Sequence, residues 1–140
     1  MDKDFLISTD KSLLNIDFIH EFIRDSYWGQ GRTMEQTKKT IENSFCFGMY
    51  SKSRNQIGFA RVVTDYAFFG YFMDVIIAPE YQGKGLGKVL VDTMLANETI
   101  QILQTVALKT KDAHELYEKF GFKKIVDSPL WMSIDRQKLK

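Results

Sequence analysis

A run of glycines and lysines stands directly after the most apolar segment of the chain. The run reads Gln82-Gly83-Lys84-Gly85-Leu86-Gly87-Lys88, and it follows Val75-Ile76-Ile77-Ala78. Glycines before a helix let backbone N–H groups point at an anion, and the helix dipole adds partial positive charge there. The lysines add formal charge. The pattern predicts a loop that binds phosphate or pyrophosphate; the alternative is a tight strand-to-helix turn that holds no ligand.

Two common phosphate-binding loops do not fit this spacing. An ATP-binding P-loop has four residues between its first glycine and a Gly-Lys pair that Ser or Thr follows, whereas three residues separate Gly83 from Gly87-Lys88, and Val89 follows. The dinucleotide fingerprint has a glycine three places after Gly85, where Lys88 stands. Neither nucleotide class is therefore predicted.

The run resembles a known family motif. Gln82–Gly87 is similar to the Gln/Arg-x-x-Gly-x-Gly/Ala motif of the GNAT N-acetyltransferase superfamily, and Val75–Pro79 resembles its strand-to-loop lead-in. Downstream, Ala113-His114-Glu115-Leu116-Tyr117-Glu118-Lys119-Phe120-Gly121-Phe122 resembles the second signature, Ala-x-x-Leu-Tyr-x-x-x-Gly-Phe. The resemblance implies an α/β (α+β) fold: a mixed, mostly antiparallel central sheet of six to seven strands with helices on both faces.

The resemblance further implies acetyl-CoA as co-substrate, with no metal. Backbone amides of Gly83 to Lys88 would hold the pyrophosphate, and main-chain groups of Val75 and Ile77 would pair with the pantetheine like an added strand. The Val75 amide would stabilise the developing oxyanion. The cofactor-binding residues expected in this way are Val75, Ile76, Ile77, Gln82, Gly83, Lys84, Gly85, Leu86, Gly87, Lys88 and Thr110.

Two of the implied residues have alternative interpretations. Tyr117 would protonate the departing thiolate, but it also lies on the apolar face of a predicted helix, where a tyrosine fills a core. Thr110 stands where the family often has Asn, seven residues before that tyrosine. A threonine can still form a hydrogen bond, so its role stays open.

Transfer to an amine requires that the amine lose its proton. Many relatives place Glu or His on the strand before the glycine loop, where Tyr71 stands here, and tyrosine is a poor base near neutral pH. Asp74 lies where relatives often have an acid that contacts the amine. Either Asp74 orients or deprotonates the amine, or ordered water relays the proton. Asp74 is alternatively a structural acid bonded to backbone amides.

The acceptor site is expected near the loop between the first two helices. Tyr27, Trp28 and Arg32 from that loop, together with Trp131 near the end of the chain, are the candidate substrate-binding residues. The alternative for each is ordinary packing, and for Arg32 a surface ion pair. A closed aromatic pocket would favour a small-molecule acceptor, and an open acidic groove would favour a protein.

These residues favour an acetyl-CoA-dependent N-acetyltransferase that acts on a primary amine of a small molecule. One alternative is a non-catalytic acyl-CoA-binding or regulatory module of the same fold. The other is an acetyltransferase for protein N-termini or lysines. The implied partners are coenzyme A and an amine acceptor.

Hydrophobic periodicity predicts the elements that position these residues. Helices are expected from about Ser12 to Arg24, after a Thr33–Gln36 capping box, from Leu86, and after an Asp112 cap. The expected strands are Phe5–Ser8, Phe45–Tyr50, Ile57–Tyr66, Phe69–Ala78, Thr105–Leu108, Phe122–Val126 and Leu130–Ile134.

Composition limits the remaining possibilities. The 140 residues predict a single domain over 1–140, and 19 Lys+Arg against 18 Asp+Glu leave a net charge of +1, which favours neither nucleic acid nor a membrane as partner. Met1–Asp4 lacks the features of a secretory signal, and Cys46 is the single cysteine. We expect a cytoplasmic protein, with a homodimer as one possible assembly.

Overall fold

The computed structural model describes residues 4–126 and 128–136, and the chain divides into two compact units, Met1–Lys109 and Thr110–Lys140. Each unit is described by itself. The elements of the first unit are β1 (Phe5–Ser8), η1 (Lys11–Leu13), α1 (Ile16–Asp25), α2 (Met34–Glu42), β2 (Phe45–Ser51), β3 (Gln56–Thr64), β4 (Phe69–Ile77), η2 (Pro79–Tyr81), α3 (Leu86–Ala96), α4 (Glu98–Gln101) and β5 (Thr105–Leu108). The second unit contains α5 (His114–Glu118).

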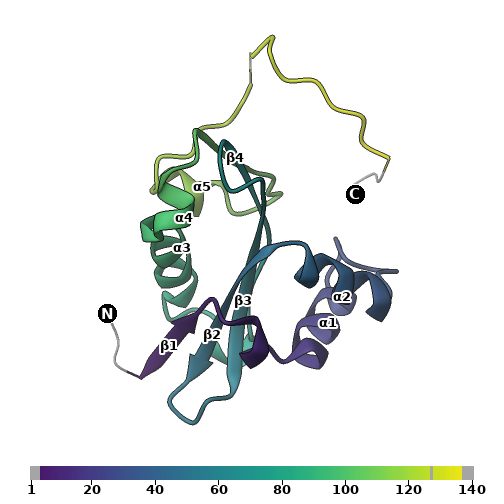
Figure 1. Cartoon of the computed structure of the whole chain (residues 1–140), viewed down its shortest axis with the longest axis vertical. Coiled ribbons are helices and arrows are strands. Elements are labelled where there is room, and N and C mark those ends of the chain that lie inside the picture. Colours follow the sequence, from purple (N-terminus) through teal and green to yellow (C-terminus); the bar gives the residue numbers. More distant parts are fainter. Residues whose placement is uncertain (1–3, 127, 137–140) are drawn as a thin grey trace. The chain divides into compact units, whose positions relative to one another are not determined.

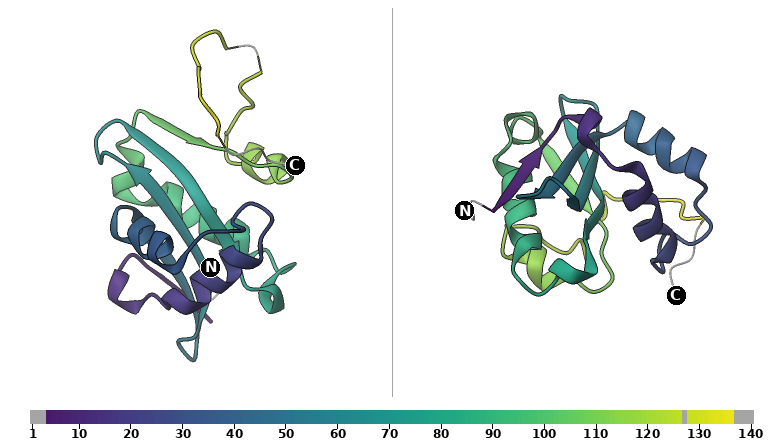
Figure 2. Two further views of the ribbon diagram at one scale, coloured as in Figure 1. Left: turned by 90° about the vertical axis from the view of Figure 1, so that its right-hand side faces the viewer. Right: turned by 90° about the horizontal axis from the view of Figure 1, so that it is seen from below.

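The first unit is built on one sheet with the strand order β1-β2-β3-β4-β5. The first three pairings along this order are antiparallel, and β4 pairs with β5 in parallel. Helices α1 and α2 lie on one face of this sheet, and α3 and α4 lie on the other (Figures 1 and 2). The predicted mixed, mostly antiparallel sheet with helices on both faces is confirmed.

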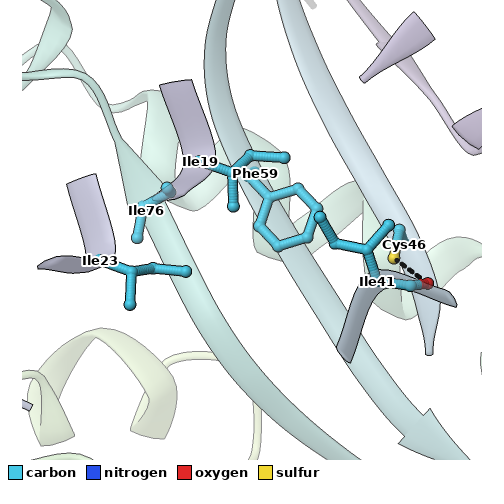
Figure 3. Close-up of a cluster of buried hydrophobic side chains, with 6 residues drawn as sticks. All are labelled: Ile19, Ile23, Ile41, Cys46, Phe59 and Ile76. Atoms are coloured by element: carbon cyan, nitrogen blue, oxygen red, sulfur yellow. Dashed lines mark hydrogen bonds between the residues drawn. The ribbon is translucent and has the colours of Figure 1, made fainter. Parts of the chain in front are cut away.

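Apolar side chains hold α1 and α2 against the sheet. Alternate residues of a strand point to the same face, and β2, β3 and β4 each contribute one side chain to this core. Figure 3 shows the cluster, which comprises Ile19, Ile23, Ile41, Cys46, Phe59 and Ile76. Burial raises the pKa of the Cys46 thiol to about 11, so Cys46 is a neutral core side chain near neutral pH.

A second cluster holds α3 against the opposite face. Leu86, in the first turn of α3, packs with Met49 and Ile57 from the sheet, and Leu90 and Met94 of the same helix are fully buried. This packing fixes the N-terminus of α3 close to the end of β4. The glycine loop that joins the two elements is therefore anchored at both of its ends.

Local capping sets the ends of the first two helices. The predicted capping box is confirmed, because Thr33 Oγ1 accepts from the Gln36 N–H and Gln36 Oε1 accepts from the Thr33 N–H. The single helix expected from about Ser12 is divided into η1 and α1. Asn15 causes the division, since its side chain accepts from the Phe18 N–H and so caps α1 in the middle of the expected helix.

The two strands expected at Phe122–Val126 and Leu130–Ile134 are wrong. Both ranges are described, neither contains a strand, and the sheet of the described residues has five strands rather than six to seven. Most of the apolar side chains of these ranges are exposed, as in Met132 at 93%. Alternating apolar residues produce a strand only where a neighbouring strand supplies a ladder, and the sequence pattern does not show whether one is present.

Candidate active site

A β-bulge interrupts β4 at the residues expected to meet the acetyl group. Phe59 pairs with Ile76, and Arg61 pairs with Met73. Two residues of β4, Asp74 and Val75, therefore stand opposite one residue of β3, Ala60. Asp74 has a φ of 54°, in the left-handed region that side chains rarely adopt. The bulge bends β4 and changes the direction of the following backbone, which includes the Val75 amide.

From Met73 onward, one side of β4 has no paired strand among the described residues. The parallel ladder between β4 and β5 ends at the pair Phe72–Leu108, so in the described part of the chain Met73–Ile77 pairs with β3 alone. An unpaired strand edge offers backbone donors and acceptors to an extended ligand. The open edge coincides with Val75 and Ile77, the residues expected to bind pantetheine.

Asp74 is buried at the centre of a charged network. Its Oδ2 accepts from Arg61 Nε at 2.6 Å and from one terminal guanidinium nitrogen of Arg32 at 2.8 Å, while its Oδ1 accepts from the other at 3.3 Å. Only 2% of the Asp74 side chain is exposed, against 6% for Arg61 and 16% for Arg32. Arg61 also donates to Ser44 Oγ at 3.1 Å. The network joins β3, the start of β4's bulge and the loop before α2.

This geometry favours the structural interpretation of Asp74, with arginines as its partners in place of backbone amides. A carboxylate offers about four lone-pair positions, and three of those of Asp74 are occupied by guanidinium N–H groups. A base must present a free oxygen to the amine. Arg61 was not among the expected site residues, although its position on the face of Ile57, Phe59 and Val63 is a signal, since a buried charge requires a partner.

The loop between α1 and α2 places Arg32 and Trp28 together. The Arg32 guanidinium carbon lies 5.9 Å from the centroid of the Trp28 ring, within the range of a cation–π contact. Ser26 Oγ donates to the Ile23 carbonyl and accepts from the Gly29 N–H, which fixes the start of the loop. A side chain at Gly29 would collide with Ile23, so the close approach of the loop to α1 requires glycine there.

The glycine loop has the geometry of an open cradle. Gly83 and Gly85 both have φ of 79°, and a Cβ added at either one would meet nothing within 4 Å. Gly85 is the N-cap of α3, and no side chain caps the helix there. The first N–H groups of a helix lack intrahelical partners, so those of α3 are available to a ligand. Gln82 joins the start of the loop to the end of β4, because its side-chain amide donates to the Ile77 carbonyl at 2.9 Å.

The charges around the cradle suit an anion. Lys84 and Lys88 are exposed, Lys84 Nζ lies 5.4 Å from the centroid of the Tyr81 ring, and the first turn of α3 contains no acidic residue. A ligand with a pyrophosphate and a long extended arm fits both features. The pyrophosphate meets the N–H groups at the cradle, and the arm lies along the unpaired edge of β4. The residues of the first unit therefore fit coenzyme A.

In the second unit, Tyr117 is a buried residue of α5. It is 8% exposed, and its ring makes an edge contact with Phe122 at 5.8 Å between centroids. Burial raises the pKa of the Tyr117 phenol above its ordinary value of about 10, so the hydroxyl keeps its proton near neutral pH. A protonated phenol is the form that a proton donor to a thiolate requires.

Thr110, rather than Asp112, supports the start of α5. Thr110 Oγ1 accepts from the Ala113 N–H at 3.0 Å, and the N-cap residue is Ala113 rather than Asp112. The expected Asp112 cap is therefore wrong, and Thr110 supports the turn that leads into the helix. The other candidate of this unit, Trp131, is half exposed in the segment after α5.

A cavity of about 680 Å³ opens beside the loop that contains Trp28. Its walls come from α1, from the loop after α1, from the turn into β3, and from Ala78–Gln82 after β4. It thus shares Gln82 with the glycine cradle and Trp28 with the Arg32–Asp74 pair. Tyr27, the remaining candidate for the acceptor site, is exposed and does not line this cavity.

Two kinds of feature are absent from the described residues. Residues 4–126 and 128–136 hold no group of three or more His, Cys, Asp or Glu side chains placed to bind a metal ion. No helix in this part of the chain is long and apolar enough to cross a membrane. The absence of a metal from the reaction, the cytoplasmic location and the homodimer stay predictions of the sequence.

Comparison with known proteins defines the class. The family described as "Acetyltransferase (GNAT) domain" matches residues 42–124. A protein of Gibberella zeae named as a putative acetyltransferase is 31% identical over 83% of this chain and 77% of its own length. A crystal structure of a putative GNAT-family acetyltransferase from Xanthomonas campestris is 36% identical, with a TM-score of 0.85 over 96% of this chain and 94% of that one.

The chain belongs to the GNAT acetyltransferase family. It is an acyltransferase, and the co-substrate of the family fold is acetyl-CoA. A spermidine N-acetyltransferase from Vibrio cholerae, solved in complex with CoA and spermine, shares this fold at a TM-score of 0.68 and 23% identity over 86% of this chain and 81% of that one.

Proposed function

We propose that this protein is an N-acetyltransferase that moves an acetyl group from acetyl-CoA to the primary amine of a small molecule. The observation that carries the proposal is the continuity of the donor site along β4. The open edge at Met73–Ile77 leads through the Gln82–Ile77 hydrogen bond into the cradle at Gly83–Lys88. An extended thioester with a pyrophosphate at its far end matches this arrangement.

The chain's own groups supply binding and orientation. The bound thioester supplies the activated acetyl group. N–H groups of Gly83 to Lys88 would hold the pyrophosphate, and the edge of β4 would align the pantetheine so that the Val75 amide donates to the acetyl carbonyl oxygen. The Arg61–Asp74–Arg32 network holds the bulge that directs this amide. Tyr117 would give its proton to the sulfur that leaves.

Removal of the amine proton is assigned to water rather than to Asp74. The oxygens of Asp74 are engaged by Arg32 and Arg61, which supports the alternative in which ordered water relays the proton. The network also places two guanidinium groups beside one carboxylate, so it has an excess of positive charge. Positive charge near the bound amine favours its neutral, nucleophilic form.

A small acceptor is supported by the size and the aromatic lining of the cavity beside Trp28. Its volume of about 680 Å³ lies within the roughly 300–1,000 Å³ of typical small-molecule sites. We therefore place the acceptor of this protein among small amines.

The test is release of free thiol from acetyl-CoA in the presence of a panel of small amines and of peptides with a free N-terminus or lysine. We expect thiol release that depends on a small amine. With peptides, the rate of thiol release should equal the rate of acetyl-CoA hydrolysis without an acceptor. Because the Cys46 thiol is buried and neutral, a thiol reagent in the assay reports coenzyme A rather than the protein. Binding of acetyl-CoA without turnover of any amine would favour the non-catalytic module, and preferred turnover of peptides would favour the protein acetyltransferase.

A further inference from the structure

The cavity beside Trp28 has walls of an unusual composition. Aromatic rings of Phe18, Phe22, Trp28 and Tyr81 form its apolar surface, and the carboxylates of Glu21, Asp25 and Glu80 lie among them. None of its lining residues is Lys, Arg or His. An apolar cavity that carries only negative charge is complementary to an organic cation, because aromatic faces and carboxylates both attract ammonium groups.

The acids of the cavity differ in how far their charge is already balanced. Asp25 forms an ion pair with Arg24 Nε at 3.6 Å, and both side chains are largely exposed. Glu21 and Glu80 are exposed, and neither forms an ion pair within the described residues. Glu21 and Glu80 are therefore the acids best able to attract a cationic ligand.

Positive charge lies next to two residues of the cavity wall, Gln82 and Trp28. Next to Gln82 is the cradle with Lys84 and Lys88, and next to Trp28 is the network of Arg32, Asp74 and Arg61. The cradle attracts the phosphates of coenzyme A, and the acidic cavity repels them. The two sites share Gln82, but their opposite charges direct coenzyme A to the cradle and a cationic acceptor to the cavity.

From this distribution we propose that the acceptor is an extended amine with a second positive charge, a di- or polycation, which lies in the cavity beside Trp28. The far ammonium group binds between the aromatic rings and the carboxylates of Glu21 and Glu80. The reacting amine lies toward Trp28, where the excess charge of the arginine network favours its neutral form. This proposal rests on the proposed function and specifies its substrate class.

The test compares three amines of equal chain length that differ only at the far end: 1,5-diaminopentane, pentylamine and 5-aminopentanoate. With acetyl-CoA held constant, we expect kcat/KM for the diamine to exceed that for pentylamine about tenfold, since a cation held by aromatic rings and two carboxylates gains roughly 1.4 kcal/mol. The carboxylate-bearing amine should be the poorest acceptor. Equal values for the three amines, or a preference for 5-aminopentanoate, would overturn the proposal.

Substitution of the acids tests the location of the site. The double variant Glu21→Gln/Glu80→Gln should lose most of the preference for the diamine, so that its ratio of kcat/KM for the diamine to kcat/KM for pentylamine approaches one. Glu42→Gln, an exposed acid in the last turn of α2 outside the cavity, is the matched control and should keep the preference. A preference that survives the double variant would place the cation elsewhere and contradict the proposal.

Calorimetry separates this proposal from the one on which it rests. Titration of 1,5-diaminopentane into the protein with coenzyme A present measures binding without chemistry. If the diamine binds in a manner that depends on Glu21 and Glu80 but no amine releases thiol, the acceptor site is supported and acetyl transfer is not. If thiol release proceeds with pentylamine and the diamine shows no binding, acetyl transfer is supported and the cationic site is wrong.

Discussion

The bulge in β4 and the glycine loop that follows it use their polar groups in opposite ways. At the bulge, the carboxylate of Asp74 is nearly inaccessible and is bonded to two arginines, one of which is bonded in turn to Ser44. In the loop, Lys84 and Lys88 are exposed, a Cβ at Gly83 or Gly85 would meet open space, and no side chain caps the first N–H groups of α3. The bulge satisfies its own charges and so holds a shape, whereas the loop leaves charge for a ligand. Substitutions in the two regions should therefore alter different quantities.

The largest effect is expected at the bulge, and on stability. Asp74→Asn removes the charge that compensates Arg32 and Arg61, and the loss of one member of a buried ion pair costs about 3–5 kcal/mol of the free energy of unfolding. Urea denaturation measures this difference. The control is Asp92→Asn, an exposed residue of α3, which should change the free energy of unfolding by less than about 0.5 kcal/mol. Equal stability of the two variants would show that the network does not hold the bulge.

The next effect is expected in the glycine loop, and on affinity. Gly85→Glu places a carboxylate at the N-terminus of α3 in the space assigned to pyrophosphate, so acetyl-CoA should bind about 100-fold more weakly, roughly 2.7 kcal/mol. Isothermal titration measures the affinity.

Gly31→Glu is a matched control for backbone strain. Gly31 has a φ of 87°, close to the 79° of Gly85, and a Cβ there also meets open space. The two variants should lose similar stability, while only Gly85→Glu loses affinity for acetyl-CoA. Similar affinities for the two variants would mean that the pyrophosphate binds elsewhere.

Tyr117→Phe should reduce turnover while affinity for acetyl-CoA is unchanged. Removal of a proton donor lowers kcat about 100-fold, whereas the loss of one hydroxyl leaves the ring packed against Phe122. Because burial raises the Tyr117 pKa above about 10, the phenol remains protonated as pH rises from 7 to 9. Ionisation of Tyr117 should therefore cause no fall in the kcat of the wild-type protein between pH 7 and 9. The pH profiles of the wild-type protein and of Tyr117→Phe should have the same shape over that interval. Unchanged kcat in the variant would return Tyr117 to the role of a core side chain.

The smallest effect is expected for Lys88→Gln. An exposed lysine contributes less than about 1 kcal/mol to an ionic contact, so the affinity for acetyl-CoA should fall about threefold at low salt. The difference should disappear near 1 M salt, where the Debye length is about 3 Å. Lys52→Gln, an exposed lysine in the turn before β3, is the control with no expected effect. A difference that persists at high salt would indicate a buried contact instead of an exposed one.

The parts of the fold that depend on short-range signals follow from the sequence. The Thr33–Gln36 capping box, β5 at Thr105–Leu108 and the start of α3 at Leu86 are all at the predicted positions. Each rests on residues within one or two turns of each other. The glycine run likewise identifies its own loop, because positive φ and an open helix terminus are properties of the local backbone.

The bulge and its arginines depend on pairing between distant residues. Asp74, Arg61 and Arg32 meet because β4 shifts register against β3 and the loop before α2 folds over it, and residue spacing along the chain contains neither fact. The same limit explains the strands wrongly expected after Phe122, since alternation does not reveal whether a ladder partner exists. Arg61 alone gave a usable signal, as a charge within an apolar face.

The central claim, that the donor site on β4 serves acetyl transfer to an amine, is tested most directly by the stoichiometry of one reaction. The protein is incubated with acetyl-CoA and 1,5-diaminopentane, and free thiol and acetylated amine are measured in the same samples over time. The account predicts one acetylated amine for each thiol released, and no thiol above hydrolysis when the amine is omitted. Tight binding of acetyl-CoA with thiol release that does not depend on any amine would contradict it.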